Sequence, residues 1–448
     1  MTPAERRSAL GLAGSYSLRM LGLFLILPVF AVQARSLAGA TPLLIGLALG
    51  AYGLTQALLQ IPFGLRSDRI GRKPVIFVGL ALFAVGSVAA AMSHSIYGVI
   101  FGRVLQGSGA IAAVVMALTA DLTREEVRTR AMASIGVSIG LSFALALLLG
   151  PALAHWIGLD GIFWFTALLA LGGILILALV VPSPDRTSVH RDAEPVIGQL
   201  GGVLRNPELL RLDFGIFCLH LSMTSLFLVV PLALHDFGLP VGHHWWVYLP
   251  VLTLSVALMV PFIIQAESRG RMRPVFLGAV LTLAGALMGL HFFASSIAIV
   301  MFWLVLFFTA VNLLEASLPS LISKLAPAVA KGTAMGIYST SQFIGAFCGG
   351  TLGGWVHEVW GESGVFLFAS AVVLIWFAVA WPMGNPGRLG NLVIRIGAAA
   401  DVSALRQGLL SVPGVEDAEV VMEEGLAYLK VDNAKLDSAR LQELSLAD

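Results

Sequence analysis

GLRSDRIGRKP, residues 64–74, separates two long apolar runs of the chain. The stretch holds four basic side chains and one acid, Asp68. A charge in the hydrocarbon core of a bilayer costs roughly 2.5–3.5 kcal/mol on insertion scales, so this stretch cannot lie there. It is therefore predicted to be a very short polar connection between two membrane helices. Its excess of Arg and Lys places it on the cytoplasmic side.

The composition of the whole chain agrees with a membrane protein. Of 448 residues, 58% are hydrophobic and only 12% are charged, which excludes an ordinary soluble globule. The net charge of +1 gives no reason to expect a nucleic-acid partner. Cys218 and Cys348 both lie in apolar runs and predict neither a disulfide framework nor a metal site. No cofactor is expected. The first apolar run is too long for a signal peptide and contains Arg19.

The apolar runs predict twelve membrane helices in two sets of six. Each run is about as long as a bilayer requires, roughly 17–25 residues. The predicted domains are a first bundle (1–181), a cytoplasmic linker (182–208), a second bundle (209–385) and a hydrophilic C-terminal domain (389–448). The runs lie near 10–34, 41–63, 74–92, 96–119, 131–154, 161–181, 210–234, 243–265, 272–292, 296–323, 331–355 and 361–383.

Basic residues cluster on one side of this arrangement. On the other side the connections hold one basic residue, Arg35, and several histidines. Because cytoplasmic connections carry the excess of Lys and Arg, both termini and the linker are predicted to be cytoplasmic. The histidines are interpreted as neutral interfacial residues, with a zinc or proton-sensing role as the alternative. The clustered basic residues are Arg6, Arg7, Arg124, Arg128, Arg130, Arg186, Arg211, Arg269, Arg271, Arg273, Lys324 and Lys331, besides those of 64–74.

The two halves of the chain look like copies of one another. GRKPVIFVGL from Gly71 has a counterpart in GRMRPVFLGAV from Gly270. RAMASIGVSIG from Arg130 has one in TAMGIYSTSQFIG from Thr333. Both pairs are offset by about two hundred residues, which predicts a parallel repeat with the substrate path at the seam between the halves.

The last part of the chain is hydrophilic and alternates over short segments. It predicts a strand at 392–396, a helix at 402–410, a hairpin of 419–422 and 427–431, and a second helix at 434–444. This order suits a ferredoxin-like α+β domain that lacks its last strand. The segment has no cysteine, so metal binding through a CxxC loop is excluded. It could bind a small ligand, a partner protein or a second copy of itself.

Two motifs resemble those of the major facilitator transporters. The signature loop of that family, G-x-L-a-D-R-x-G-R-K/R, is matched at Gly64, Leu65, Asp68, Arg69, Gly71, Arg72 and Lys73. A second motif, R-x-x-Q-G-x-G-A, is matched at Arg103, Gln106, Gly107, Gly109 and Ala110. Gly150-Pro151 resembles part of the antiporter signature of drug–proton exchangers. The resemblance covers nearly the whole chain and extends to bacterial inner-membrane members with a cytoplasmic ferredoxin-like appendage.

The resemblance implies a secondary active transporter with two six-helix bundles that rock around a central cavity. No GxxxxGK[ST] motif occurs, so the expected energy source is the proton gradient rather than a nucleotide. We expect export of a small amphiphilic molecule or drug from a multi-pass protein of the bacterial inner membrane. One rival is a membrane sensor that signals through its C-terminal domain. A membrane enzyme is not expected, because no nucleophile–base set is found.

The acid of the signature loop predicts a conformational latch. Asp68 could face the N-terminus of the helix that begins near Lys331, where an anion gains about 0.3–2 kcal/mol from the helix dipole. That contact would hold the bundles together on the cytoplasmic side. Arg72 is expected to pair with Asp121 at the end of the fourth helix. The alternative is that these charges only set the topology.

Four ionisable residues fall deep inside predicted helices: Arg19, Arg103, His220 and Glu315. Such residues usually face a cavity. Burial favours the protonated form of a carboxylate, so Glu315 could carry the proton. The alternative for Glu315 is a structural pair with Asn312 or Lys324, or with Arg103 across the cavity. Arg103 and Arg19 could bind substrate or balance a carboxylate, and His220 could titrate or simply pack.

Overall fold

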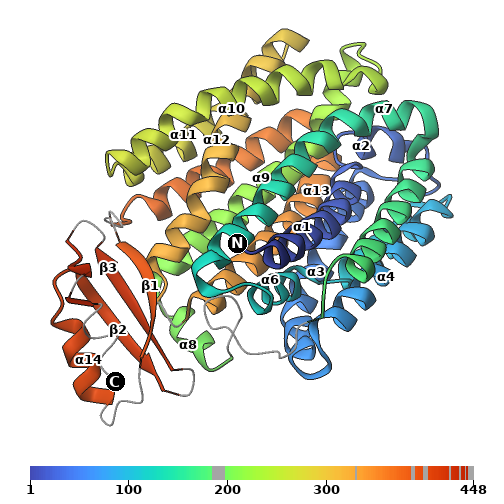
Figure 1. Ribbon diagram of the computed structural model, residues 1–448. Coiled ribbons are helices and arrows are strands. Elements are labelled where there is room, and N and C mark those ends of the chain that lie inside the picture. The colour runs from blue at the N-terminus through green and yellow to red at the C-terminus, as the bar shows by residue number, and fades with distance from the viewer. Residues whose placement is uncertain are drawn as a thin grey trace.

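The computed structural model describes residues 1–183, 197–327, 330–384, 389–396, 402–422, 425–432, 435–438 and 440–441. It shows a long body of packed helices with a small α+β unit at one end (Figure 1). Residues 184–196 of the predicted linker lie outside the described residues, and so do residues 434, 439 and 442–444 of the predicted helix and residues 423–424 of the hairpin.

The helices of the first half range from short turns to the long α3 and α7. Among them, α3 begins at an N-capping Thr41 whose side chain accepts from the Leu44 amide, and it ends at Gly71. The elements are α1 (Pro3–Phe24), α2 (Phe30–Gln33), the 3₁₀ turn η1 (Ala34–Ser36), α3 (Pro42–Ile70), α4 (Arg72–Ala91), α5 (Ile96–Ser108), α6 (Ala112–Asp121) and α7 (Glu125–Leu179).

The helices of the second half follow the same plan. Helix α9 lies in the interior, with 83% of its most apolar window buried, whereas α10 is peripheral with 28%. The elements are η2 (Ile197–Gln199), α8 (Leu200–Val203), α9 (Pro207–Asp236), η3 (Val241–His243), α10 (Trp245–Ser268), α11 (Met272–Phe293), α12 (Ile297–Leu325) and α13 (Lys331–Ala380).

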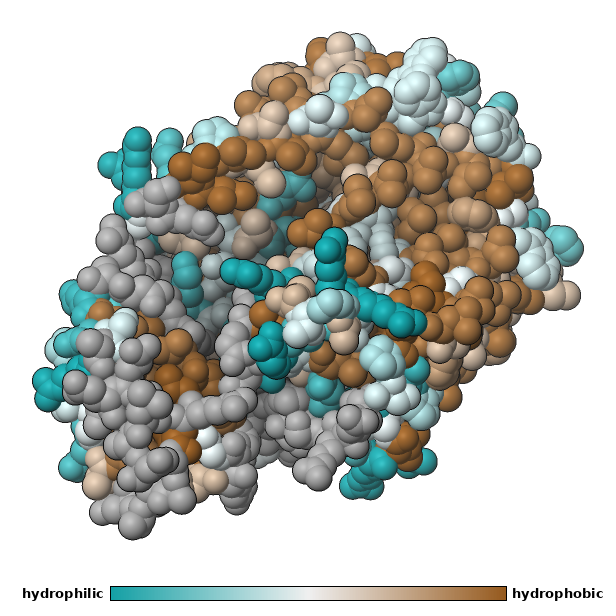
Figure 2. Space-filling view, viewed as in Figure 1, coloured by the Kyte–Doolittle hydropathy of each residue, from teal (hydrophilic) through white to brown (hydrophobic). Residues whose placement is uncertain are grey.

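The predicted membrane fold of twelve helices is confirmed. Nine stretches of the described residues are long and apolar enough to cross a bilayer. Two of them, in α7 and α13, each contain two helices joined at a kink, Gly158 and Gly361. Counting these separately and adding α1 gives the twelve crossings. Apolar side chains face outward along the helical body, as a lipid-facing surface requires (Figure 2).

Left-handed glycines mark the repeat in the backbone itself. Gly158 and Gly361 have nearly identical torsions, φ 68° and ψ −174° against φ 72° and ψ −174°. The helix-ending Gly71 and Gly270 form a second pair with φ of 95° and 62°. Gly39 and Gly238 form a third. Each pair is offset by about two hundred residues, so the two halves turn at equivalent places.

Three helix boundaries differ from the prediction. Residues 64–70 were expected in a polar loop, but they continue α3, and the connection shrinks to Gly71. The helix continues through Pro62 and Gly64 and ends only at Gly71, whose φ of 95° is not helical, so its charged last turns extend past the apolar run. The first helix ends at Phe24 rather than near residue 34, shortly before Pro28. The fourth is interrupted between Ser108 and Ala112, at Gly109.

Among the described residues, the C-terminal unit follows the predicted order of strand, helix and two-stranded hairpin. Strand β1 (Leu389–Arg395) is followed by α14 (Val402–Leu410), β2 (Val415–Val421) and β3 (Leu426–Asp432). The sheet order is β1-β3-β2, and both pairs are antiparallel. In register, Leu389 lies opposite Asp432, and Val421 opposite Leu426. This is a split βαβ unit, in which β3 lies between the two parallel strands.

Side chains of β3 alternate between two environments. Leu429 and Val431 belong to the small core of the C-terminal unit, with Leu409 of α14. Tyr428 is 2% exposed and joins the core of the helical body instead. Lys430 donates from Nζ to the Leu325 carbonyl at the end of α12, at 3.1 Å. The unit is therefore docked on α12, and this partial burial lowers the pKa of Lys430.

Replacing Gly361 by Ala should lower stability by about 1–2 kcal/mol, because a Cβ disfavours left-handed torsions. A Cβ at Gly361 would meet no atom within 4 Å, so the cost is conformational rather than steric. The measurement is the thermal unfolding midpoint in detergent. Gly285→Ala is the control, because that glycine also faces open space but has ordinary helical torsions. An equal effect of both substitutions would contradict the prediction.

Candidate functional site

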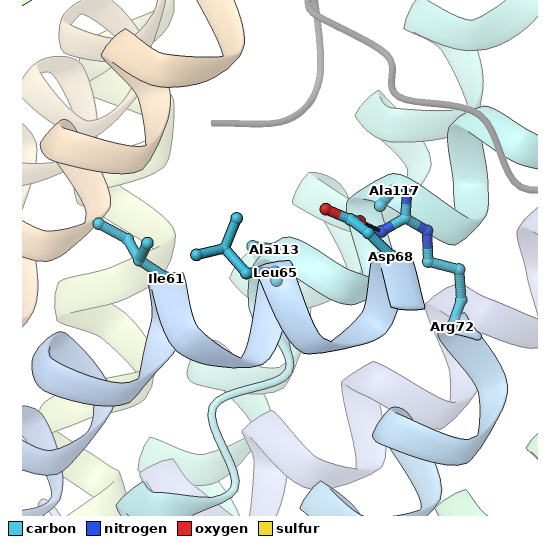
Figure 3. A pocket seen from close by; sticks show the side chains of 7 residues that line it. Ile61, Leu65, Asp68, Arg72, Ala113 and Ala117 are labelled. Atoms are coloured by element: carbon cyan, nitrogen blue, oxygen red, sulfur yellow. Dashed lines mark hydrogen bonds and ion pairs between the residues drawn. The ribbon is translucent and has the colours of Figure 1, made fainter. Parts of the chain in front are cut away.

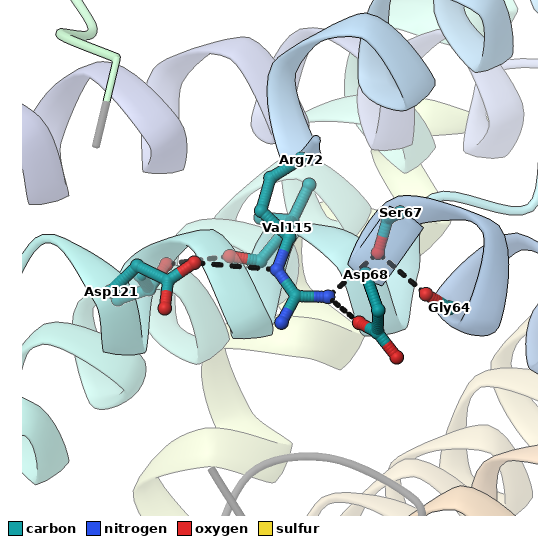
Figure 4. Close-up of polar contacts among 7 residues, drawn as sticks. Gly64, Ser67, Asp68, Arg72, Val115 and Asp121 are labelled. Carbon is teal, nitrogen blue, oxygen red and sulfur yellow. Dashed lines mark hydrogen bonds and ion pairs between the residues drawn. The ribbon is translucent and has the colours of Figure 1, made fainter. Parts of the chain in front are cut away.

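The acid and the arginine of the signature segment form a buried ion-pair cluster at the junction of α3 and α4 (Figure 4). The Arg72 side chain is 1% exposed and pairs with Asp68 and with Asp121, at 3.3 Å from Nε to the Asp121 Oδ2. Arg72 Nη1 also donates to Ser67 Oγ at 2.8 Å. The predicted pair of Arg72 with Asp121 is confirmed. It ties α3 and α4 to the end of α6.

Other signature residues attach the segment to the same half. Lys73 donates from Nζ to the carbonyl of Val181, at 2.7 Å, just beyond the end of α7. Gly71 supplies the left-handed turn. Arg69 is exposed in the last turn of α3. The signature segment thus connects the junction of α3 and α4 to the ends of α6 and α7.

Asp68 borders a small pocket beside α3 (Figure 3). Its side chain is 30% exposed, whereas that of Asp121 is fully buried. Among the described residues, the Asp68 carboxylate pairs with Arg72 and forms no hydrogen bond or ion pair with the second half. A latch at the N-terminus of α13 thus stays a prediction. The pocket is lined by Ile61, Gly64, Leu65, Asp68, Arg72, Ala113 and Ala117, all from the first half.

The halves are closed against each other at the other face of the body, where α3 begins. Helix α3 runs antiparallel to the first part of α13, and glycines allow their backbones to touch. A Cβ on Gly46 would lie 2.1 Å from the Gly350 carbonyl oxygen, and one on Gly50 would lie 2.7 Å from that of Phe347. At the signature end of α3, by contrast, a Cβ on Gly64 would meet nothing within 4 Å.

Polar contacts also cross the seam at the closed face. Glu358, in the last turn of the first part of α13, accepts a hydrogen bond from the Leu43 amide at 3.2 Å. Leu43 lies in the first turn of α3, so this carboxylate sits at a helix N-terminus. Arg35 pairs with Glu362 at 3.5 Å. The lone basic residue of that side thus binds the opposite half.

Two buried arginines lie inside the first half rather than at the seam. Arg19 is fully buried and donates from Nη2 to Tyr52 Oη and to the Gly109 carbonyl, each at 2.8 Å. Arg103 donates to the Ala48 carbonyl at 3.2 Å. The ring of Tyr52 lies between them, 5.8 Å from the Arg19 guanidinium and 5.2 Å from that of Arg103. In the described part of the chain, neither arginine pairs with a carboxylate.

The second motif explains how helices approach one another in the first half. Gln106 accepts from Arg103 Nη1 at 2.7 Å and donates to Ser87 Oγ at 2.7 Å, which links α5 to α4. A Cβ on Gly107 would lie 2.2 Å from the Tyr52 carbonyl, and one on Gly109 would lie 2.1 Å from that of Gly79. The motif therefore supports packing, and its predicted part in proton or substrate binding stays a prediction.

Glu315 and His220 come together in the second half. His220 Nε2 of α9 lies 3.4 Å from Glu315 Oε1 of α12. Gln342 Nε2 of α13 lies 2.7 Å from the same His220 nitrogen. The Glu315 side chain is 36% exposed, which leaves it open to solvent or substrate. Of the alternatives considered for Glu315, Asn312 donates instead to Ser255 at 3.2 Å. In the described part of the chain, Glu315 forms no ion pair with Lys324 or Arg103.

Two further polar residues of this region were missed in the sequence. Asp213 on α9 is 4% exposed, and Tyr338 on α13 is 4% exposed. Asp213 escaped notice because it lies early in its helix, close to the charges of the linker. Its spacing of seven residues from His220 was the available signal, because it places both on one face of a helix.

Aromatic rings from both halves meet at the seam. Phe143 of α7 contacts Phe227 of α9 and Phe308 of α12, with ring centroids 6.0 and 6.4 Å apart. Tyr52 of α3 contacts Phe343 of α13 at 6.3 Å. These rings form apolar contacts across the boundary between the two halves. Among the described residues, no three metal-ligating side chains converge.

Comparison with known proteins agrees with this architecture. The family model of the Major Facilitator Superfamily matches residues 12–313 and 212–413, and the YajR YAM domain matches residues 394–439. The chain is 49% identical over 442 residues to the inner membrane transport protein YajR of Escherichia coli, covering 97% of this chain and 96% of that one. It is 24% identical over 381 residues to the multidrug resistance protein MdtH of Klebsiella pneumoniae, covering 82% and 92%.

Solved structures share the fold at low sequence identity. A bacterial homologue of the human lysosomal transporter Spinster superimposes with a TM-score of 0.69 at 14% identity, covering 85% of this chain and 97% of that one. The human organic anion transporter MFSD10 superimposes with a TM-score of 0.60 at 20% identity, covering 85% and 100%.

Replacing Arg72 by Met should destabilise the first half by about 3–5 kcal/mol, because it removes the cation that neutralises the buried Asp121 carboxylate. Thermal unfolding of the purified protein measures the effect. Arg66→Met is the matched control, because Arg66 is exposed in the same segment and its loss should change stability little. Similar unfolding midpoints for the two variants would show that the cluster contributes no stability.

Proposed function

The chain belongs to the major facilitator superfamily, and we propose that it is a proton-coupled secondary transporter that exports a small amphiphilic molecule by alternating access. One observation carries the coupling: a carboxylate and an imidazole, Glu315 and His220, form a partly exposed pair between helices of the second half. Ionisable side chains inside a membrane protein carry an energetic cost, and for that reason they usually mark a functional site.

The charge distribution supports an assignment of the two faces. The signature segment, the start of α1 and the C-terminal unit share one face, which carries most Arg and Lys residues. We assign this face to the cytoplasm, with both termini, in the inner membrane. The closed face between α3 and α13 is then periplasmic. On this assignment the structure represents an inward-facing state.

Proton binding at the Glu315–His220 pair would change its charge by one unit. In a region of low dielectric constant, a charge that faces the path opposes closure of the bundles around it, because closure removes the water that solvates the charge. A proton on the pair removes that cost. The pair is therefore placed to make the change of state depend on proton occupancy.

The aromatic seam supports an amphiphilic substrate. Phe143, Phe227 and Phe308 pack against one another where the two halves meet, so separation of the halves would expose apolar rings there. Glu315 supplies a polar group on the same helix as Phe308. Relatives such as MdtH are named as multidrug resistance proteins, which agrees with export of such molecules.

Two carboxylates are placed to stabilise opposite states. In this structure Glu358, near the end of one helix, sits at the N-terminus of α3 and helps to close the periplasmic face. Asp68 lies near the C-terminal end of α3, on the same face of the body as the N-terminus of α13. Because α3 and α13 are antiparallel, closure of the cytoplasmic face would bring Asp68 to the N-terminus of α13, in the mirror of the Glu358 contact.

The docked C-terminal unit favours a regulatory role beside transport rather than in its place. Lys430 and Tyr428 attach β3 to the end of α12, the helix that carries Glu315. A ligand or partner on the unit would thus act on the helix that holds the proposed proton site.

Glu315→Gln should abolish substrate-driven proton flux in vesicles, because glutamine cannot carry the proton. The measurement uses a compound identified by a thermal-shift screen of amphiphilic molecules on the purified protein. The control is Glu208→Gln, a carboxylate of α9 that already pairs with Arg211 three residues away. Unaltered proton flux in the Glu315 variant would remove this residue from the mechanism.

Asp68→Asn and Glu358→Gln should shift the conformational equilibrium in opposite directions. Loss of the Glu358 contact should favour opening of the periplasmic face, and loss of Asp68 should disfavour it. A contact worth about 0.3–2 kcal/mol changes the ratio of the two states by about two- to thirty-fold. The measurement is the distance between spin labels at the exposed Ser36 and Phe237, one in each half, which should increase when the periplasmic face opens.

Glu419→Gln, an exposed carboxylate of the C-terminal unit, serves as the control for this distance measurement. Shifts of the same sign for Asp68→Asn and Glu358→Gln would contradict the pair of opposing latches.

A further inference from the structure

Asp213 is a buried carboxylate that has no hydrogen-bond partner in the described part of the chain. The residue is 4% exposed, and among the described residues no group donates a hydrogen bond to either of its carboxylate oxygens. The hydroxyl of Tyr338, on the facing helix, is buried and unpartnered as well. Neither residue belongs to the ion-pair clusters described above. Each therefore requires an explanation other than packing.

The energetic cost of this arrangement is large for an ionised group. An unpaired carboxylate in a medium of low dielectric constant costs several kcal/mol, and the cost disappears when the group carries a proton. Arg19 and Arg103 cannot compensate it, because both are held inside the first half by Tyr52 and by backbone carbonyls. Asp213 is thus in a setting that favours a bound proton.

The contact between α9 and α13 places Asp213 within about one helical turn of Tyr338 along the helix axes. A row of close approaches pairs Phe217 with Gly345, and Leu221 with Gly349. The residues advance by four on both helices, so the helices are parallel, and one turn earlier Asp213 lies level with Ser341. Tyr338 is three residues before Ser341. It is also four residues before Gln342, which contacts His220, so Tyr338 and Gln342 share a face of α13.

The polar residues of this region lie at different depths along the helix axes, measured from the proposed cytoplasmic face. With 1.5 Å per residue, Asp213 and Tyr338 lie about 10 Å from the starts of α9 and α13. Glu315 lies about 15 Å from the end of α12 at the same face, and His220 about 20 Å from the start of α9. The order from the proposed cytoplasmic face is Asp213 with Tyr338, then Glu315, then His220.

We propose that Asp213 is a second proton-binding carboxylate, which exchanges protons between the cytoplasm and the Glu315–His220 pair through the Tyr338 hydroxyl. The inference rests on the proposed proton coupling and adds the route by which the coupling site is loaded or emptied. The titratable groups that face this route are His220 on α9, Glu315 on α12 and Tyr338 on α13.

The transfer itself moves one proton and no electrons. For loading from the cytoplasm, the O–H bond of protonated Asp213 breaks and its proton binds the Tyr338 oxygen, while the Tyr338 proton passes to the Glu315 carboxylate. Asp213 is left ionised and Glu315 neutral, and emptying runs in reverse. No hydrogen bond joins Tyr338 Oη to another described group in this state. The transfer thus requires a side-chain rotation or a bridging water.

Infrared spectroscopy of the full-length protein in lipid nanodiscs tests the inference without a substrate. At neutral pH the wild-type spectrum should contain the carbonyl band of a protonated, buried aspartic acid. Asp213→Asn should remove this band, and Asp213→Glu should move it. Glu208→Gln, on the same helix but paired with Arg211, should leave it unchanged. A spectrum of Asp213→Asn that keeps every protonated-carboxyl band would overturn the proposal.

Tyr338→Phe tests the route. After transfer to deuterated buffer, exchange of the Glu315 carboxyl proton should slow several-fold in this variant and in Asp213→Asn. Unchanged exchange in both would overturn the relay. The two levels of the proposal are separable: if Glu315→Gln leaves proton-driven transport intact while the Asp213 band still disappears in Asp213→Asn, the coupling fails and proton binding at Asp213 stands.

Discussion

Hydrocarbon does not solvate charge, and this constraint determines where the charged side chains of the protein lie. Every charged side chain must lie outside the apolar layer or pair with another group, and one that does neither is expected to have a function. The residues of the signature segment use the first two solutions. Arg69 is exposed at the end of α3, whereas Arg72 is buried between Asp68 and Asp121. Asp213 has no hydrogen-bond partner among the described residues, and Glu315 pairs with an imidazole that is charged only when protonated. These are the two acids to which we assign proton binding.

The same constraint explains the asymmetry between the two halves. Arginines of the first half are enclosed by Tyr52, glutamines and backbone carbonyls, which suits a rigid bundle. The second half holds acids and a histidine that can change protonation. Glycines at the α3–α13 contact, such as Gly46 and Gly350, let the backbones touch at the closed face. The half that encloses the arginines and the half that holds the proposed proton-binding residues thus meet along a glycine-lined contact, where packed helices can shift between two arrangements.

Much of the architecture could be predicted, because hydropathy and turn chemistry are local. Gly71 and Gly270 marked the repeat in the sequence, and both adopt left-handed torsions in the structure. The Arg72–Asp121 pair was predictable because the motif fixes one partner and the end of the fourth helix supplies the other. The extent of α3 was not, because apolar length does not say where a helix ends once it has left the bilayer. The signal of Asp213 was hidden by its closeness to the polar linker.

By itself, the sequence determined the twelve membrane crossings, the internal repeat, the α+β unit and the family. These depend on runs and spacings that add up along the chain. The tertiary structure alone decided that Glu315 meets His220 and Gln342, that Arg19 and Arg103 face inward within the first half, and which end of the seam is closed. Such contacts depend on the rotation of each helix about its axis and on its lateral neighbours. When apolar residues surround a helix, its hydropathy carries little information about either.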